Sequence, residues 1–253
     1  MNKRNVFVIL HQRLLVGLCL VVCGLSGSAY AQVGTHADTQ GGKHDQANAQ
    51  AQHSAFTLAD LQQQLAAQTV VRGDFTQTRH MAMFSAPLQS SGHFLLAQDH
   101  GLLWQQTVPF PVSLVLTQDK LSQQFGDSPA QVIAAKDNPM VFYFSHLFLS
   151  LFKGDTQQLT EQFTVSLTQP ASPESGESAG AQWALTLTPT AAPLNAVFQH
   201  IRLSGGQFID QLVLTEKRGD VTEIQFSHQR AVSATSGKTA TTLTKEEQRA
   251  FQL

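Results

Sequence analysis

Short runs of alternating apolar and polar residues, separated by turn residues, most constrain the fold of this chain. In residues 71–75, apolar or small side chains alternate with charged ones, which is the period of a half-buried strand. Turn signals such as Asp99-His100-Gly101 and Gly205-Gly206 separate successive runs. Strands are predicted in this way at residues 70–80, 91–98, 101–107, 112–118, 121–126, 162–169, 182–188, 197–204, 207–216 and 219–229. Short strands recurring at this spacing indicate a mainly β chain, built as an antiparallel sheet, sandwich or barrel.

Helical signals occur at the two ends of this strand-rich region. Thr57-Leu58-Ala59-Asp60 resembles a capping box with Asp in place of the usual Glu or Gln, and leucines at positions 58, 61 and 65 follow at helical spacing. We therefore expect a short amphipathic helix at about residues 58–68. A second short helix is expected at residues 245–251, and polar loops are expected at 170–181 and 233–240.

One apolar segment interrupts the strand pattern. Asn138-Pro139 is a typical helix start, the run MVFYFSHLFLSLF follows, and Gly154 provides a C-terminal stop. This helix, at residues 139–153, is apolar on nearly all sides, yet it is too short to span a bilayer. Two interpretations remain open at this point: an ordinary buried helix packed on a sheet, or a lid over an apolar cavity.

The N-terminus has the three parts of a secretory signal peptide. Lys3 and Arg4 form a basic region, residues 14–25 form an uninterrupted apolar run, and Ala29-Tyr30-Ala31 is a small-x-small cleavage pattern. The apolar run is much shorter than the about 20 residues of a membrane-spanning helix. We predict a signal peptide over residues 1–31, cleaved after Ala31, with an uncleaved anchor as the alternative. The mature chain would then be periplasmic.

Removal of this segment changes both the cysteine content and the charge. Both cysteines, Cys19 and Cys23, lie within it, so the mature chain contains neither a disulfide nor a thiolate. Three of the 16 basic residues also lie within it, which leaves 13 against 18 acidic residues and a formal charge of −5. Because no stretch concentrates Lys or Arg, neither nucleic acid nor an anionic membrane surface is expected as the main partner. Residues 55–253 are expected to form a single domain, monomeric in solution.

Residues 32–54 are predicted to be a flexible leader, since they contain almost no large apolar side chain. The leader holds His36, His44 and His53 at irregular spacing, so a polar linker is favoured over a metal-binding tail.

Motifs for catalysis are missing from the sequence. It has no Gly-x-Ser-x-Gly, no phosphate-binding glycine motif and no His-Glu-x-x-His, and its other histidines are scattered. We therefore expect a protein that is not an enzyme and that holds neither a cofactor nor a metal.

Several motifs, in this order, resemble the periplasmic outer-membrane lipoprotein carrier family, LolA. Residues 75–77 (Phe-Thr-Gln) begin the match, and Gly92 follows with an apolar strand at 94–96. A twelve-residue step separates Gly92 from Trp104, which opens the Trp-x-x-Thr-x-Pro pattern of residues 104–109. Later matches are Leu-Thr-Leu-Thr-Pro at 185–189 and the hairpin sequence at 219–224. The resemblance covers roughly residues 56–230 and is that of a divergent member.

The resemblance implies a fold and a function. The fold would be an incomplete antiparallel β-barrel of about ten to eleven strands, with short helices forming a lid. The function would be that of a periplasmic carrier or chaperone that shelters the acyl chains of lipoproteins, or of another acylated lipid such as a glycolipid. The implied partners are this acylated cargo, an inner-membrane release machinery and an outer-membrane acceptor.

Positions for a lipid-binding cavity follow from this resemblance and from the alternation of strand side chains. The expected lining residues are Phe75, Phe94, Leu96, Leu102, Trp104, Leu114, Leu116, Phe144, Leu147, Phe148, Leu151, Leu185 and Leu187. The family commonly has an Arg-Pro pair between the glycine and the tryptophan, with the arginine holding the lid shut. Here Gln98-Asp99 occupies those positions, so Gln98 is the expected lid-control residue. A neutral amide cannot form the charge-assisted hydrogen bond of an arginine.

Two other classes of function remain as alternatives. A sensory or structural module could use the same sheet to bind a protein partner. A hydrolase of lipid or cell-wall esters is the other, and the missing nucleophile motif counts against it.

Overall fold

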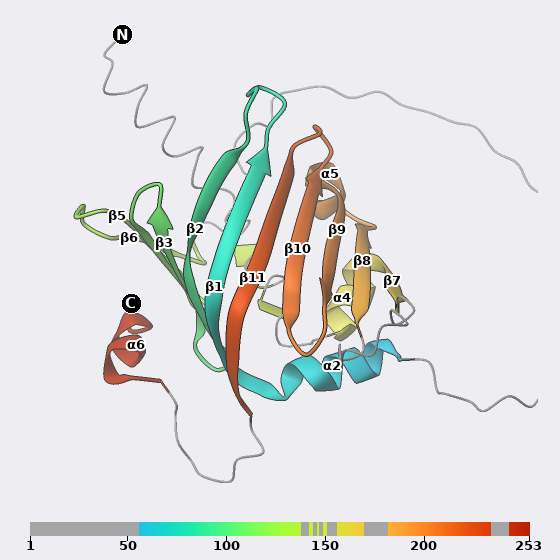
Figure 1. The fold of residues 1–253 in the computed structure, drawn as a ribbon, viewed down its shortest axis with the longest axis horizontal. Helices are drawn as coiled ribbons and strands as arrows, with labels where there is room; N and C mark the ends of the chain where they lie inside the picture. The colour runs from blue at the N-terminus through green and yellow to red at the C-terminus, as the bar shows by residue number, and fades with distance from the viewer. Residues whose placement is uncertain are drawn as a thin grey trace, which may run out of the picture.

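One antiparallel sheet of eleven strands forms the body of the protein (Figure 1). The computed structural model describes residues 56–137, 142–143, 146, 149–150, 156–169, 182–233 and 243–253. The predicted signal peptide and leader, the loop at 170–181 and most of the loop at 233–240 lie outside these residues. The structure therefore tests the strand prediction almost completely.

The strands follow one another as two meanders. The first contains β1 (Gln68–His80), β2 (Leu88–Ala97), β3 (Gly101–Val108), β4 (Val112–Leu116), β5 (Lys120–Phe125) and β6 (Gln131–Ala134). The second contains β7 (Phe163–Thr168), β8 (Trp183–Pro189), β9 (Phe198–Gly205), β10 (Ile209–Glu216) and β11 (Val221–Ser233).

The first and last strands join the two meanders. β1 pairs antiparallel with β11 over nearly its whole length, from Gln68 opposite Ser233 to His80 opposite Val221. The sheet order is therefore β6-β5-β4-β3-β2-β1-β11-β10-β9-β8-β7, with β6 and β7 at the two open edges. The predicted incomplete antiparallel barrel with short helices is confirmed.

The structure adds three elements that the sequence pattern did not predict: β6, α4 (Thr156–Gln162) and α5 (Leu194–Val197). β6 has only four residues, and its exposure does not alternate, so it carries no period-two signal. α5 has four residues, and α4 runs directly into β7. Elements this short give too few turns for a helical period to be recognised.

The predicted terminal helices are present as α2 (Leu58–Ala66) and α6 (Lys245–Ala250). Thr57 Oγ1 accepts a hydrogen bond from Asp60 N, and Thr57 N donates to Asp60 Oδ2 at 2.8 Å, so the expected capping box is formed. α6 begins with an equivalent capping box between Thr244 and Glu247. Within the described residues, no helix combines the length and apolar character needed to span a membrane.

The apolar segment at 139–153 is only partly described. Its described residues, 142–143, 146 and 149–150, are helical, as predicted. Its remaining residues lie outside the described part of the chain.

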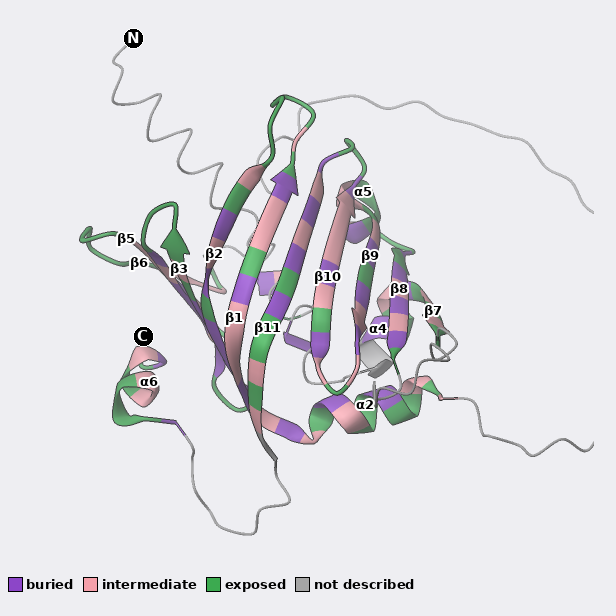
Figure 2. Cartoon of the chain, in the orientation of Figure 1, coloured by how far each residue is buried: buried purple, intermediate pink, exposed green. Residues whose placement is uncertain are grey.

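Burial alternates along the strands and divides the sheet into two faces (Figure 2). On β2, Phe94 and Leu96 belong to the large core cluster, whereas Leu95 and Ala97 belong to a smaller one. β1, β3 and β4 divide in the same way. We call the face with the large cluster the inner face and the opposite one the outer face. Both faces are covered in this corner of the sheet, which explains why β2 and β3 contain continuous apolar runs.

Candidate functional site

The inner face of the sheet carries a continuous apolar surface made from both meanders. Nine of the predicted lining residues are described, all nine lie in this one cluster, and none is more than 6 % exposed. They are Phe75, Phe94, Leu96, Leu102, Trp104, Leu114, Leu116, Leu185 and Leu187. The other four, Phe144, Leu147, Phe148 and Leu151, lie outside the described residues. The residues predicted from the period-two alternation of strand side chains therefore share one face of the sheet.

Aromatic rings occupy the centre of this face. The rings of Phe75 and Trp104 stack with their centroids 3.6 Å apart. Phe226, on the neighbouring β11, meets the Phe94 ring edge-on at 5.1 Å and the Trp104 ring at 6.3 Å. Gly73 makes room for this group, because a Cβ atom there would lie 2.8 Å from the Phe94 ring. Phe226 was not among the predicted lining residues, although it alternates with Ile224 on the same strand.

Helices cover the apolar surface. We call this group the helical cover: α2, α4 and the helical residues 142–143, 146 and 149–150. Leu61 and Leu65 of α2, Leu159 of α4, and Phe142 and Leu149 all pack into the inner-face cluster. A gap of about 20 Å³ remains where α2 meets β1 and β2, between Leu65, Val71 and Phe94. That gap holds about one water molecule. Side chains of the cover therefore fill this part of the inner face.

Polar side chains contact the helical cover at its margins. Gln64 Nε2 on α2 donates to Gly206 O at 2.5 Å, and the Tyr143 hydroxyl donates to Gln162 Oε1 at 2.7 Å. The exposed His146 ring contacts Gln118 O through Nε2 at 2.5 Å. Burial raises the pKa of the Tyr143 phenol above its usual range.

Gln98, the expected lid-control residue, lies at the end of α2. Its Nε2 donates to Ala66 O at 3.2 Å and to Leu65 O at 3.4 Å, and its backbone N–H donates to Thr69 O at 3.0 Å. The side chain therefore satisfies carbonyls that a helix leaves unpaired at its C-terminus. Among the described residues, the contacts of this side chain are with α2, which crosses one end of the sheet (Figure 1).

A buried ion-pair group lies at the other end of the inner face. Arg79 on β1 contacts Glu216 at 3.2 Å and Asp220 at 3.7 Å, and all three side chains are at most 7 % exposed. Arg218, which is half exposed, also contacts both carboxylates. Burial raises the pKa of the Glu216 carboxyl, and the neighbouring arginines lower it by less. Sequence reasoning missed this group, although Arg79 shares the alternation of Phe75 and so points to the inner face.

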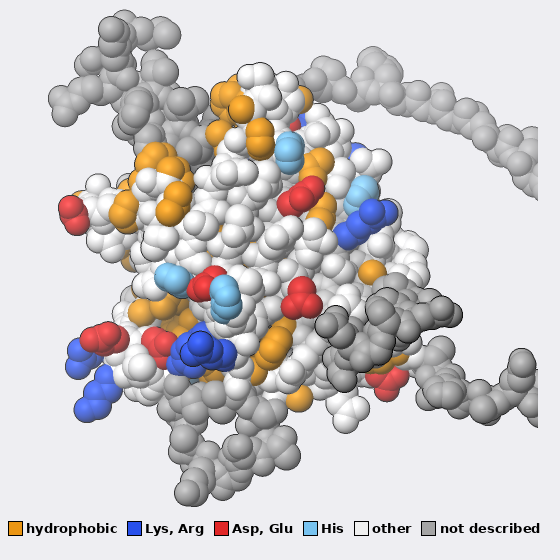
Figure 3. All heavy atoms as spheres, viewed as in Figure 1, with side chains coloured by type: hydrophobic (Ala, Val, Ile, Leu, Met, Phe, Trp, Pro, Cys, Tyr) orange, Lys and Arg blue, Asp and Glu red, His pale blue; other side chains and the backbone are white. Residues whose placement is uncertain are grey.

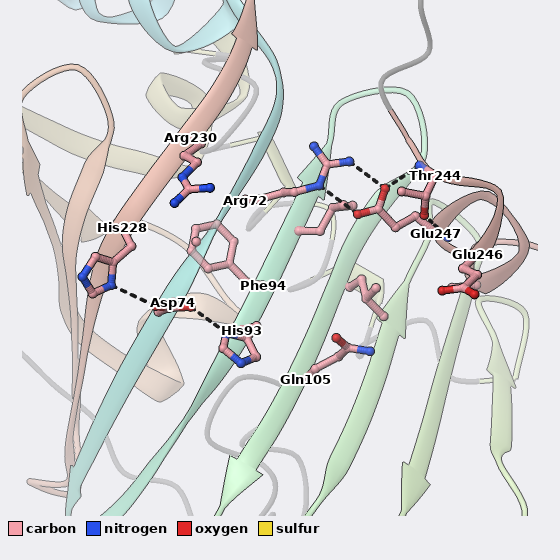
Figure 4. Close-up of a pocket in the computed structure, with 14 residues that line it drawn as sticks. Arg72, Asp74, His93, Phe94, Gln105, His228, Arg230, Thr244, Glu246 and Glu247 are labelled. Atoms are coloured by element: carbon pink, nitrogen blue, oxygen red, sulfur yellow. Dashed lines mark hydrogen bonds and ion pairs between the residues drawn. The ribbon is translucent and has the colours of Figure 1, made fainter.

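The outer face holds an open groove of about 850 Å³ between the sheet and α6 (Figure 4). Asp74 lies between two histidines there, with its Oδ1 2.6 Å from His93 Nδ1 and its Oδ2 2.9 Å from His228 Nδ1. These two contacts lower the pKa of the Asp74 carboxyl. A β-bulge brings His228 to this position, with φ at 51°. Both histidine side chains are exposed.

The groove residues are arranged neither as a Ser-His-Asp relay nor as a metal site. Ser227 Oγ lies 3.5 Å from the same His228 nitrogen that contacts Asp74, whereas a relay needs the two ring nitrogens to serve different partners. Among the described residues, no group of three or more His, Cys, Asp or Glu side chains is arranged to hold a metal ion.

Comparison with protein families decides the assignment of the chain. The model of the family described as "Outer membrane lipoprotein carrier protein LolA" matches residues 66–239. The chain belongs to the LolA family. Proteins of this family are periplasmic lipoprotein carriers and not enzymes. The prediction that the chain is a divergent member of the LolA family is thereby confirmed.

Three solved structures that resemble this member of the LolA family are each at most 14 % identical to it. A LolA superfamily protein from Nitrosomonas europaea is 10 % identical, with a TM-score of 0.37, over 71 % of this chain and 95 % of that one. A putative outer membrane lipoprotein-sorting protein domain from Vibrio parahaemolyticus is 8 % identical, with a TM-score of 0.40, over 78 % and 97 % of the two chains. The Pseudomonas aeruginosa MucA/MucB complex structure gives 14 % identity and a TM-score of 0.42, over 71 % and 59 %. No curated protein matches the sequence.

Proposed function

We propose that this protein is a periplasmic carrier that shelters the acyl chains of lipoproteins, or of another acylated lipid, during transfer from the inner to the outer membrane. The observation that carries the proposal is the one-sided apolar inner face, which sheet residues of both meanders form and separate helices cover. Membership of the LolA family supports the same assignment.

The energetics favour exchange between the helical cover and an acyl chain. Leaving one CH₂ group in water costs about 0.8 kcal/mol, so a long acyl chain needs an apolar surface at least as extended as itself. Withdrawal of Leu61, Leu65 and Leu159 would expose apolar side chains that an acyl chain can cover in turn. The free energy that is lost when the helical cover moves away from the sheet is thereby largely recovered when the acyl chain binds to the inner face.

The margins of the cover are suited to such movement. Gln98 and Gln64 hold α2 through neutral side-chain amides, and each such hydrogen bond contributes only about 1 kcal/mol net. We propose that Gln98 sets how firmly α2 closes, in the role that the family commonly gives to an arginine. Opening at this end of α2 would then break the hydrogen bonds of Gln98 and Gln64.

The remaining parts of the proposal concern export and exchange. A signal peptide cleaved after Ala31 would deliver the chain to the periplasm as a monomer. A release machinery in the inner membrane would load it, and an outer-membrane acceptor would unload it.

Native mass spectrometry of the protein purified from the periplasm, followed by organic extraction, tests the proposal. The expected result is a lipid or acylated peptide at near one-to-one stoichiometry, which also identifies the cargo class. An apo mass, together with failure to take up a fluorescent fatty acid, would overturn it. The same spectrum reports the N-terminal residue and therefore the cleavage position.

A further inference from the structure

Exposed apolar side chains gather at two neighbouring hairpin tips. Met83 and Phe84, in the β1–β2 connection, are 69 % and 38 % exposed, and Val108 and Phe110, at the β3–β4 connection, are 54 % and 38 % exposed. β2 pairs with both β1 and β3, so the two tips project from the same end of the sheet. Figure 3 shows apolar side chains over both tips, at the top and at the upper left of the view. We call these four residues the apolar tips.

The apolar tips contain no charged residue. Residues 81–87 read Met-Ala-Met-Phe-Ser-Ala-Pro, and residues 108–111 read Val-Pro-Phe-Pro. Exposed apolar groups of this kind mark contact sites for proteins or membranes. The tips are separate projections of two hairpins, a shape that a fluid bilayer accommodates without a matching surface.

The backbone of the tips is also suited to a medium poor in water. Phe84 N donates to Met81 O at 3.0 Å, Gln106 Nε2 donates to Phe110 O at 3.1 Å, and Gly126 N donates to Pro111 O at 3.0 Å. The prolines at positions 87, 109 and 111 have no N–H group to satisfy. Polar backbone groups without partners are costly in lipid, so hydrogen bonds inside the tips reduce the cost of insertion.

Positive charge lies beside the β1–β2 tip. Ala82 N donates to Asp220 Oδ1 at 3.2 Å, which places the turn at 217–220 next to this tip. Lys217 and Arg218 of that turn are exposed, and Arg218 also pairs with the buried carboxylates of Glu216 at 2.7 Å and Asp220 at 3.1 Å, so Lys217 supplies the charge beside the tip. Apolar side chains flanked by cations are the pattern that binds the surface of an anionic bilayer.

We propose that the apolar tips, with Lys217 and Arg218 beside them, form a surface that docks on an anionic phospholipid bilayer. Phe84 and Phe110 enter the interface, and Lys217 contacts lipid phosphates. The inference extends the proposed function, because a carrier that rests on a membrane by this end presents one rim of its inner face to the lipid. Its test, however, needs no cargo.

Flotation with lipid vesicles tests this surface. The exported protein, with its N-terminus checked by mass spectrometry, is mixed with phosphatidylethanolamine–phosphatidylglycerol vesicles or with phosphatidylcholine vesicles. We expect binding to the anionic vesicles and weaker binding to the neutral ones. The double variant F84S/F110S should lower the bound-to-free ratio by about tenfold or more, because each phenyl ring loses its apolar contact with lipid. Lys217→Glu should lower binding to the anionic vesicles only.

Val132→Ser is the matched control, since Val132 is also an exposed apolar residue, 53 % exposed, but lies on the edge strand β6. Its binding should equal that of the wild type. The proposal is overturned if the wild type binds neither kind of vesicle, or if F84S/F110S binds as well as Val132→Ser. Loss of a stable protein complex in F84S/F110S, without vesicle binding by the wild type, would assign the tips to a protein partner instead.

Fatty-acid uptake by the same variants separates this inference from the proposed function. Uptake should be unchanged in F84S/F110S, since neither ring belongs to the inner-face cluster. A wild type that floats with vesicles but takes up no fatty acid would overturn the carrier and leave membrane docking intact.

Discussion

Phe75 and Trp104 stack face to face at 3.6 Å, although they lie on β1 and β3, two strands that do not pair with each other. β2 runs between them and presents Gly92 opposite Phe75, so no side chain separates the two rings. A residue larger than glycine cannot replace Gly92, because its Cβ would lie 1.9 Å from Gln105 O. The aromatic centre of the inner face therefore depends on one glycine in the intervening strand.

The stack makes Trp104 a reporter of cargo. The chain has only two tryptophans, and Trp183 lies at the other end of the cluster, where its Nε1 donates to Gly206 O at 2.7 Å. We expect a titration with a fatty acid to change the fluorescence of Trp104, because the acyl chain replaces packed side chains around its ring. The signal should persist in Trp183→Phe and disappear in Trp104→Phe. A response that survives only in Trp104→Phe would place the cargo elsewhere.

Residues of the inner face should also support the closed state. Leu102 is 2 % exposed and packs in the cluster, so Leu102→Ala should lower the free energy of unfolding by about 2–5 kcal/mol. The exposed Val132 gives a matched change, and Val132→Ala should cost less than about 0.5 kcal/mol. Urea denaturation measures both variants. Equal stabilities would show that Leu102 does not pack in the cluster in solution.

The sequence predicted the inner face better than its surroundings, and the reason is physical. Period-two alternation fixes which residues of one strand share a face, so the sequence alone groups Phe94 with Leu96, and likewise Leu102 with Trp104. The local turns then fix the register of neighbouring strands.

Contacts distant in the sequence could not be found in this way. Asp74 and His228 are separated by 154 positions and meet through a β-bulge between β1 and β11. Arg79 meets Glu216 across 137 positions. Neither the pairing of the first and last strands nor the position of a bulge leaves a signal in the local hydrophobic period. The sequence therefore shows these four residues only as isolated polar side chains and does not reveal that they meet in pairs.

Gln98 should control how tightly α2 closes. Gln98→Ala removes two hydrogen bonds to the C-terminal carbonyls of α2 and should destabilise its closed position by about 1 kcal/mol. Gln98→Arg supplies a charged donor to the same carbonyls and should hold α2 more firmly. Hydrogen exchange of residues 58–66 should therefore be faster in Gln98→Ala and slower in Gln98→Arg. Fatty-acid uptake should follow the same order, and identical uptake rates in all three proteins would contradict a role in closure.

Arg79 should be essential for the stability of the sheet at the end that carries the apolar tips. Arg79→Met leaves two buried carboxylates without their buried partner and should lower the free energy of unfolding by about 3–5 kcal/mol. Arg218 contacts the same carboxylates from an exposed position, so Arg218→Met should cost only about 1 kcal/mol or less. Thermal melting of the two variants compares them directly. Similar melting temperatures would mean that burial does not distinguish the two arginines.

The C-terminal segment, residues 243–253, should be held less firmly on the outer face at acid pH. Arg72 donates to both Glu247 oxygens, from Nε at 2.8 Å and from a terminal nitrogen at 2.6 Å, and these hydrogen bonds lower the pKa of the Glu247 carboxyl (Figure 4). A carboxyl with a lowered folded-state pKa stabilises the fold above its unfolded pKa, and this contribution is lost as the pH falls through the folded value.

The protection of residues 243–253 against hydrogen exchange, relative to the intrinsic exchange rate at each pH, should therefore fall below the usual pH range of glutamate. In Arg72→Ala the exchange should already be faster at neutral pH, because about 1 kcal/mol of ion-pair stabilisation is removed. Arg230 lies opposite Arg72 in the ladder between β1 and β11 and lines the same groove. Arg230→Ala is therefore the matched control and should leave the exchange unchanged. Leu243 and Phe251 would still contact Leu95 and Leu103 through apolar packing. Exchange in Arg72→Ala equal to that in Arg230→Ala would mean that the ion pair between Arg72 and Glu247 does not hold the segment.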